Sequence, residues 1–224
     1  MTANADPLPI ADTVAEGRSD VQDVAVDAGA RKRPKPGERR VQILQALAAM
    51  LEQPGAERVT TAALAARLAV SEAALYRHFA SKAQMFEALI DFIEQSVFSL
   101  VNQLGERESD PVARCRKLVS LLLQFGERNP GMTRVMVGDA LVFENERLQQ
   151  RMNLFFDKIE SSLRQDLRDA ATQTGSTTPS VDAQASASVV TAFCVGRLQR
   201  YARSGFKRLP SESLEHGLAL LLPS

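Results

Sequence analysis

Residues 60–79 read TTAALAARLAVSEAALYRHF, and this segment predicts two short helices separated by a tight turn. Ser71 provides a hydroxyl that can cap the first turn of the second helix. Leu75 and Phe79 are four residues apart, so they fall on one buried stripe of that helix. The pattern is typical of a helix-turn-helix, in which the second helix enters the major groove of DNA.

The side of the second helix opposite that stripe is the candidate recognition surface. At about 100° per residue, Ala73 and Arg77 lie on this side, and Tyr76 and His78 flank it. A small residue allows close approach to base edges, whereas the flanking polar side chains can reach phosphates. The predicted DNA contacts of this surface and of the neighbouring helix starts are Thr60, Thr61, Ser71, Ala73, Tyr76, Arg77, His78 and Lys82. Tyr76 and His78 could also simply complete the packing of a small domain.

The net charge of the 224 residues is zero, but the charges are unevenly distributed. Residues 1–30 contain one Arg against six Asp and Glu, whereas residues 31–82 contain ten Lys and Arg against four Glu. The positive excess coincides with the helix-turn-helix, and the run RKRPKP at residues 31–36 leads into it. A charged run is often only a solvated surface, but its position here favours an arm that contacts phosphates.

The sequence argues against several classes of protein. No segment has the pattern of a membrane span or a signal peptide, so we expect a cytoplasmic protein with no membrane partner. Cys115 and Cys194 lack any metal-ligand spacing, which predicts two buried thiols, no disulfide and no metal site. The sequence also lacks a glycine-rich phosphate loop and a nucleophile elbow. We therefore expect neither an enzyme nor a bound cofactor.

The pattern divides the chain into three parts. Residues 1–36 mix Asp, Ala, Pro and Gly without periodicity, and we expect a disordered extension that ends in the basic arm. Residues 37–82 are expected to form a DNA-binding domain of three helices, the first of which ends before Pro54 and Gly55. Residues 83–224 are expected to form a helical domain for dimerisation and partner binding.

Helical periodicity continues through this C-terminal part, and no strand pattern appears. The segment SKAQ at residues 81–84 has the form of a capping box and opens a long helix. Further helices are expected from Pro111, over residues 133–143 and 146–171, from a cap at Asp182 to about residue 203, and over residues 211–222. The predicted fold is all-α, with an N-terminal helix-turn-helix domain and a C-terminal helical bundle.

An apolar stripe on the penultimate helix predicts a homodimer joined through the C-terminal helices. Its residues are Val189, Phe193, Gly196, Leu198 and Tyr201, and Gly196 would allow two helices to approach closely. A two-fold dimer presents two identical recognition helices, so we expect a near-palindromic site on double-stranded DNA.

The segment LYRHFASK at residues 75–82 resembles a signature of the TetR family, whose members are dimeric all-α repressors. Three further segments, IDFIE at 90–94, LLLQFGERNPG at 121–131 and ALVFE at 140–144, resemble a divergent branch of that family, the nucleoid occlusion factors. The resemblance runs from about residue 38 to the C-terminus. It departs from the family pattern in the turn before the recognition helix, where Ala69 replaces the usual Gly. A left-handed backbone at Ala69 would cost about 1 kcal/mol.

The resemblance implies a nucleoid-associated inhibitor of cell division, which binds chromosomal DNA and FtsZ and disrupts FtsZ polymers so that the division ring does not form over the nucleoid. It also implies that FtsZ binds between the fourth and fifth helices, at positions matched here by Phe92, Leu121, Arg128 and Asn129. By pattern alone, Phe92 is a core residue and residues 128–131 are an ordinary helix terminator. No small-molecule effector is expected.

The alternative is a ligand-responsive transcriptional repressor of the same family. Its C-terminal part would hold a small molecule between helices, and binding would shift the spacing of the two DNA-binding domains. Both hypotheses predict dimers on DNA. They differ in whether the DNA complex responds to FtsZ or to a metabolite.

Overall fold

The computed structural model describes residues 37–53 and 59–222, and these residues form helices with no strand among them. The elements are α1 (Glu38–Leu51), α2 (Thr61–Arg67), α3 (Glu72–Tyr76), α4 (Lys82–Arg107), α5 (Pro111–Arg128), α6 (Pro130–Met136), the 3-10 helix η1 (Asp139–Leu141), α7 (Glu146–Gln173), α8 (Pro179–Arg203) and α9 (Leu214–Leu221). The prediction of an all-α fold is confirmed. The predicted extension at residues 1–36, its basic arm, and the expected helix terminators Pro54 and Gly55 lie outside the described residues.

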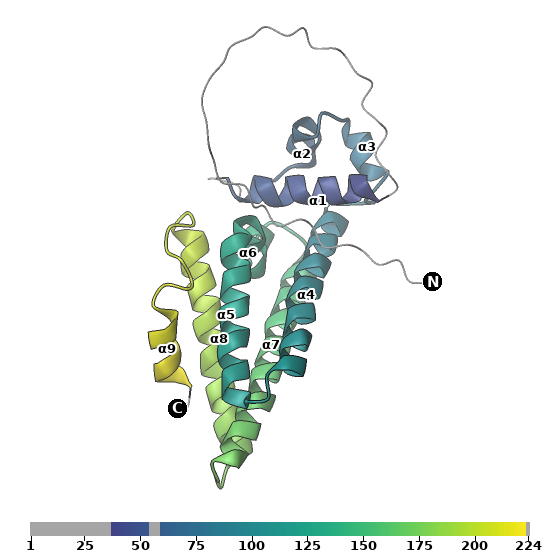
Figure 1. The fold of residues 1–224 in the computed structure, drawn as a ribbon. Coiled ribbons are helices and arrows are strands. Elements are labelled where there is room, and N and C mark those ends of the chain that lie inside the picture. Colours follow the sequence, from purple (N-terminus) through teal and green to yellow (C-terminus); the bar gives the residue numbers. More distant parts are fainter. Residues whose placement is uncertain (1–36, 54–58, 223–224) are drawn as a thin grey trace, which may run out of the picture.

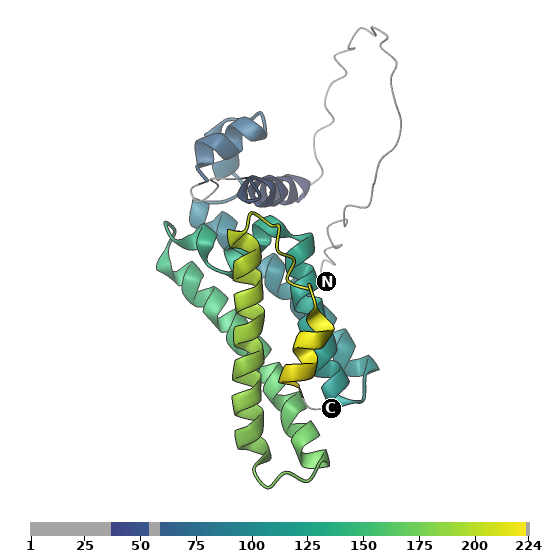
Figure 2. The ribbon, with the colours of Figure 1, turned by 90° about the vertical axis from the view of Figure 1, so that its left-hand side faces the viewer.

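Helices α1, α2 and α3 form a small head at one end of the molecule, and α4 to α9 form an elongated body (Figure 1). In the body, α4, α5, α7 and α8 run along the long axis, and α6 lies at the head end. Helix α7 packs along α8, and α5 packs against both. The short α9 packs on the outer side of α8, so that α8 and α9 share the face turned toward the viewer in Figure 2.

Apolar stripes build one continuous core through head and body. The head contributes Ile43, Leu47, Leu64, Leu75 and Phe79, and the body contributes Phe86, Ile93, Leu122, Phe155, Ile159 and Cys194, among others. Each stripe repeats every three or four residues, so the helix period alone places these side chains on inward faces. None of the helices in residues 37–53 and 59–222 is long and apolar enough to cross a membrane.

Head and body meet where α1 crosses α6. Gly131, the second residue of α6, lies so close to α1 that a β-carbon in its place would overlap the carbonyl oxygen of Ala48. One turn later, Arg134 donates a hydrogen bond of 3.3 Å to the carbonyl of Gln53. The sequence pattern predicts a helix break at residues 129–131. The structure shows in addition that Gly131 allows α1 and α6 to approach each other closely.

Two helix boundaries differ from the sequence prediction. Residues 133–143 do not form one helix, because Gly138 adopts a left-handed conformation, with φ of 84°, and separates α6 from η1. Helix α8 begins at Pro179 rather than at a cap formed by Asp182. Asp182 lies in the first turn, where its carboxylate accepts hydrogen bonds from the hydroxyls of Ser176 and Thr178.

Candidate functional site

Both helices of the helix-turn-helix begin with a side-chain cap. The hydroxyl oxygen of Thr60 accepts a hydrogen bond of 3.2 Å from the amide of Ala63, and that of Ser71 accepts one of 3.3 Å from the amide of Ala74. Such caps satisfy amide groups that would otherwise lack a partner, and each stabilises a helix by about 1 kcal/mol. They allow helices as short as α2 and α3 to start at defined residues.

The turn between α2 and α3 has a left-handed backbone at Ala69, the residue that replaces the usual Gly of the family. Ala69 has φ of 52°, and its amide donates to the carbonyl of Ala66. The amide of Val70 reaches back to the carbonyl of Ala65 at 3.0 Å, which completes a Schellman-type helix end. Ala69 therefore has the strained conformation for which Gly is the usual residue.

The residues predicted to contact DNA lie on the head and, in the case of Lys82, at the start of α4. Thr60, Ser71, Ala73, Tyr76 and Arg77 are exposed, whereas Thr61, His78 and Lys82 are half-buried. Tyr76 is 45% exposed, unlike Leu75 and Phe79, which are buried. The hydroxyl of Thr61 donates to the carboxylate of Glu72 at 2.6 Å, which links the starts of α2 and α3. The arrangement leaves the α3 surface open to a large partner.

Arg40 on α1 holds the end of the recognition helix, a role that the sequence pattern did not identify. Its guanidinium donates to the carbonyl of His78 and lies 4.0 Å from the ring centre of Phe79. Both contacts cross about 38 residues of sequence. A cation stacked on an aromatic face combines charge with packing, so Arg40 fixes α1 against the segment that follows α3.

The start of α4 connects the head to the body. The hydroxyl of Ser81 accepts a hydrogen bond of 3.2 Å from the amide of Gln84, as the capping-box pattern predicts. The side chain of Gln84 bonds the amide of Ala80 instead of that of Ser81. Lys82, the first residue of α4, forms an ion pair with Glu144 of the body.

The residues assigned by resemblance to FtsZ binding lie on α4 and α5, which pack against each other. Phe92 and Leu121 are half-buried and contact the core with part of their surface. Arg128 is exposed at the last position of α5. Asn129 links α5 to α6, and its side-chain amide donates to the carbonyl of Phe125 at 2.8 Å. Phe92 is thus less buried than its neighbours Ile90 and Ile93, which are fully buried.

The predicted dimer stripe divides between two sides of α8. Val189 is 54% exposed, and a β-carbon at Gly196 would meet nothing within 4 Å. Phe193 is half-buried, with its ring against Gly217 of α9. Leu198 and Tyr201, in contrast, are buried within the protomer, and the hydroxyl of Tyr201 donates to the carbonyl of Glu127.

The assignment of Leu198 and Tyr201 to a dimer interface was therefore wrong. At about 100° per residue, Leu198 lies on the opposite side of the helix from Val189. It belongs instead to the stripe that packs on α5 and α7.

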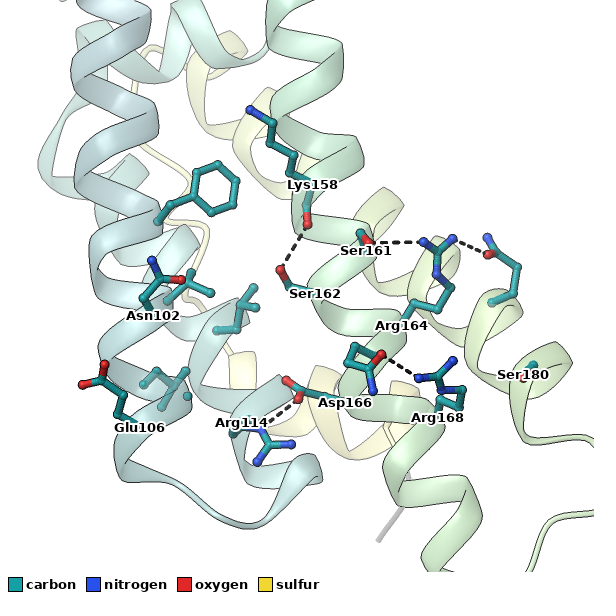
Figure 3. A pocket seen from close by; sticks show the side chains of 17 residues that line it. Asn102, Glu106, Arg114, Lys158, Ser161, Ser162, Arg164, Asp166, Arg168 and Ser180 are labelled. Atoms are coloured by element: carbon teal, nitrogen blue, oxygen red, sulfur yellow. Dashed lines mark hydrogen bonds and ion pairs between the residues drawn. The ribbon is translucent and has the colours of Figure 1, made fainter.

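A groove of about 1070 Å³ lies between α4, α5 and α7, at the end of the body away from the head (Figure 3). Its apolar residues are Phe98, Val101, Leu104 and Leu118. Three lining arginines bond to other lining residues, Arg114 to Asp166, Arg164 to Gln184 and Arg168 to Gln165. Burial raises the pKa of the Asp166 carboxyl, and the hydrogen bond and charge of Arg114 offset part of this rise.

Cys115 and Cys194 are both buried and unpaired with each other, as the sequence predicts. Burial raises the pKa of each thiol to about 12. Both thiols therefore stay protonated at neutral pH, and a protonated thiol is a poor nucleophile and metal ligand.

Comparisons with known proteins agree with this geometry. The family of bacterial regulatory proteins of the tetR type matches residues 43–89, and the tetracyclin repressor-like C-terminal domain of SlmA-like proteins matches residues 109–223. The nucleoid occlusion factor SlmA of Vibrio cholerae is 52% identical over 184 residues, which cover 82% of this chain and 93% of the relative. The nucleoid occlusion factor SlmA of Photobacterium profundum is 50% identical over 188 residues, which cover 84% of this chain and 95% of the relative.

Solved structures with low sequence identity share the fold. The transcriptional regulator FadR from Bacillus subtilis, in complex with stearoyl-CoA, superposes with a TM-score of 0.65 at 14% identity, covering 81% of this chain and 97% of FadR. The TetR-family regulator PfmR from Thermus thermophilus gives a TM-score of 0.65 at 20% identity, covering 83% of this chain and 96% of PfmR. The chain therefore belongs to the SlmA family of nucleoid occlusion factors, within the TetR family of DNA-binding regulators.

Proposed function

We propose that this chain inhibits cell division from the chromosome: a homodimer binds specific DNA sites through its heads and disrupts FtsZ polymers through the α4–α5 side of its body. Membership of the SlmA family over most of the chain carries this proposal. It acts on the nucleoid in the cytoplasm, without a cofactor, a small-molecule effector or an enzymatic step.

The DNA-binding part of the proposal is supported by the exposed surface of α3. Ala73, Tyr76 and Arg77 point away from the head core, and Arg77 adds a positive charge beside the open ring of Tyr76. The remaining proposed contacts are Thr60, Thr61, Ser71, His78 and Lys82. A two-fold dimer would place two such surfaces in successive major grooves, which requires a near-palindromic site.

The dimer part is supported by exposed apolar side chains on α8 and α9. Val181 and Val189 of α8 and Leu220 of α9 are 68%, 54% and 87% exposed. Gly196 leaves open space on the same helix, so a second helix can approach it closely. We assign Val189, Phe193 and Gly196 to the interface, without Leu198 and Tyr201.

The FtsZ part is supported by one exposed arginine and two half-buried apolar side chains on α4 and α5. Arg128 offers a free guanidinium surface at the end of α5, and Phe92 and Leu121 offer apolar area on adjacent helices. An apolar anchor with a neighbouring arginine is a common composition for the centre of a protein interface. Asn129 supports this surface by linking α5 to α6.

The test separates the two activities with Arg128→Ala. This variant should keep the DNA affinity of the wild-type protein, measured by fluorescence anisotropy, and should lose most of its ability to disassemble FtsZ, measured by light scattering with the DNA present. Arg107→Ala is the matched control, because Arg107 is also an exposed arginine at the last position of a helix, α4. It should behave as the wild type in both assays. An Arg128→Ala protein that disassembles FtsZ at wild-type potency would remove this site from the proposal.

A further inference from the structure

The ion pair at the start of α4 involves one of the proposed DNA contacts. The ammonium of Lys82 binds Oε1 of Glu144, which lies between η1 and α7, 62 residues further along the chain. The side chains of Lys82 and Glu144 are 26% and 9% exposed, so the pair is largely withdrawn from water. Lys82 therefore points toward the segment between η1 and α7.

The charges of this ion pair are arranged in the opposite way to those of the ion pairs that follow it along α4. Arg147 of α7 pairs with Glu87 of α4, and Arg151 of α7 pairs with Asp91 and Glu94 of α4. In those pairs α4 supplies the anion, whereas at its first residue α4 supplies the cation. A phosphate at the start of α4 would be attracted by the helix N-terminus and by the lysine. The Lys82–Glu144 pair is therefore one for which DNA can compete.

We propose that Glu144 competes with a DNA phosphate for Lys82, so that DNA binding releases Glu144 and alters the connection between η1 and α7. This rests on the proposed contact of Lys82 with DNA. A phosphate and the Glu144 carboxylate would repel each other if both bound one ammonium in a partly buried setting. Lys82 consequently exchanges one anion for the other, and Glu144 weakens DNA binding in the wild-type protein.

The released segment would alter an apolar surface. Val142 and Phe143, which directly precede Glu144, are 70% and 66% exposed. Because Glu144 ties this segment to α4, the position of Val142 and Phe143 is thermodynamically linked to DNA occupancy.

The first measurement uses the full chain and a DNA duplex that the chain itself selects from a random-sequence library. Glu144→Gln keeps the size of the side chain and removes its charge, and it should tighten DNA binding by up to about fivefold at low salt. The gain in affinity should shrink as the salt concentration rises, because salt weakens the Lys82–Glu144 pair that this variant removes. Glu146→Gln is the matched control, since Glu146 is an exposed carboxylate two residues away and should change the affinity less.

The double variant Lys82→Gln/Glu144→Gln separates competition from a general change in charge. Its DNA affinity should equal that of Lys82→Gln, because Glu144 cannot compete with DNA for an ammonium group that is absent. If Lys82→Gln binds DNA as well as the wild type, the assignment of Lys82 to DNA fails and the competition fails with it. If Lys82→Gln weakens binding while Glu144→Gln leaves it unchanged or also weakens it, only the competition is wrong.

Hydrogen exchange gives a second readout that does not depend on a variant folding well. In the wild-type protein, DNA should accelerate amide exchange in residues 142–147, where the amide of Glu144 now bonds the carbonyl of Leu141 at 3.0 Å. Exchange in α8 should stay unchanged. Equal protection of residues 142–147 with and without DNA would overturn the proposal.

Discussion

Two contacts near the boundary between head and body have opposite character. At the first, α1 crosses α6 with no room for a side chain at Gly131, so the contact depends on shape. At the second, Lys82 at the start of α4 binds Glu144, so the contact depends on charge. Close packing tolerates little change and is insensitive to salt, whereas an ion pair can exchange partners. The first contact therefore fixes where the head sits, whereas the second joins the start of α4 to the η1–α7 connection by charge.

The largest effect is expected from Gly131→Ala, which breaks the junction that depends on shape. Its β-carbon would overlap the backbone of α1, and the two helices would have to separate. We expect a loss of about 1 to 3 kcal/mol in the free energy of unfolding, equal at low and high salt. Gly105→Ala in α4 is the control, because a β-carbon there meets nothing within 4 Å, and it should be neutral or stabilising. Denaturant titration followed by circular dichroism measures both, and a neutral Gly131→Ala would show that α1 and α6 are not tightly packed.

A smaller effect, which unlike that of Gly131→Ala depends on salt, is expected from Arg151→Ala. Arg151 bonds Asp91 and Glu94, and these hydrogen bonds raise the pKa of its guanidinium against the opposing effect of burial. Because the group is partly exposed, its removal should cost about 1 kcal/mol or less at low salt and almost nothing at about 1 M salt. Arg147→Ala, whose side chain is more exposed, should cost less still. A cost for Arg151→Ala that persists unchanged in high salt would indicate lost packing instead of lost charge.

The smallest effect is expected from Ala69→Gly, which lies inside the head and touches neither junction. It relieves the left-handed strain at φ of 52°, and the gain is partly offset by the greater freedom of Gly in the unfolded chain. We expect a net stabilisation below about 1 kcal/mol, with no change in salt dependence. Ala66→Gly in α2 should instead destabilise by about 1 kcal/mol. If Ala69→Gly also destabilises, the turn does not store strain at this residue.

The sequence predicted the features that depend on neighbours along the chain. Ser71 and Ser81 mark helix starts because a hydroxyl can cap only the next few amides, and the apolar stripes follow from the helix period. The outward position of Tyr76 and Arg77 follows from the same geometry. Whether these residues contact DNA, and whether Arg128 contacts FtsZ, stay predictions.

The features that the sequence did not predict depend on contacts between distant segments. Nothing near Gly131 indicates that Ala48 will cross it, and nothing near Lys82 indicates that Glu144 will bind it. Leu198 was misassigned for a different reason, since α8 carries apolar residues on two sides and only the packing of α5 and α7 shows which side is core. Contacts of this kind can be identified only from the three-dimensional structure.

The central claim is that the chain, once on DNA, acts on FtsZ. The most direct measurement is light scattering of assembled FtsZ after addition of the wild-type protein, with and without the duplex it selects. We expect a fall in scattering that is larger with the duplex than without it. Unchanged scattering under both conditions, together with release of the duplex by a small molecule that binds the groove between α4, α5 and α7, would rule out this function and favour a ligand-responsive repressor.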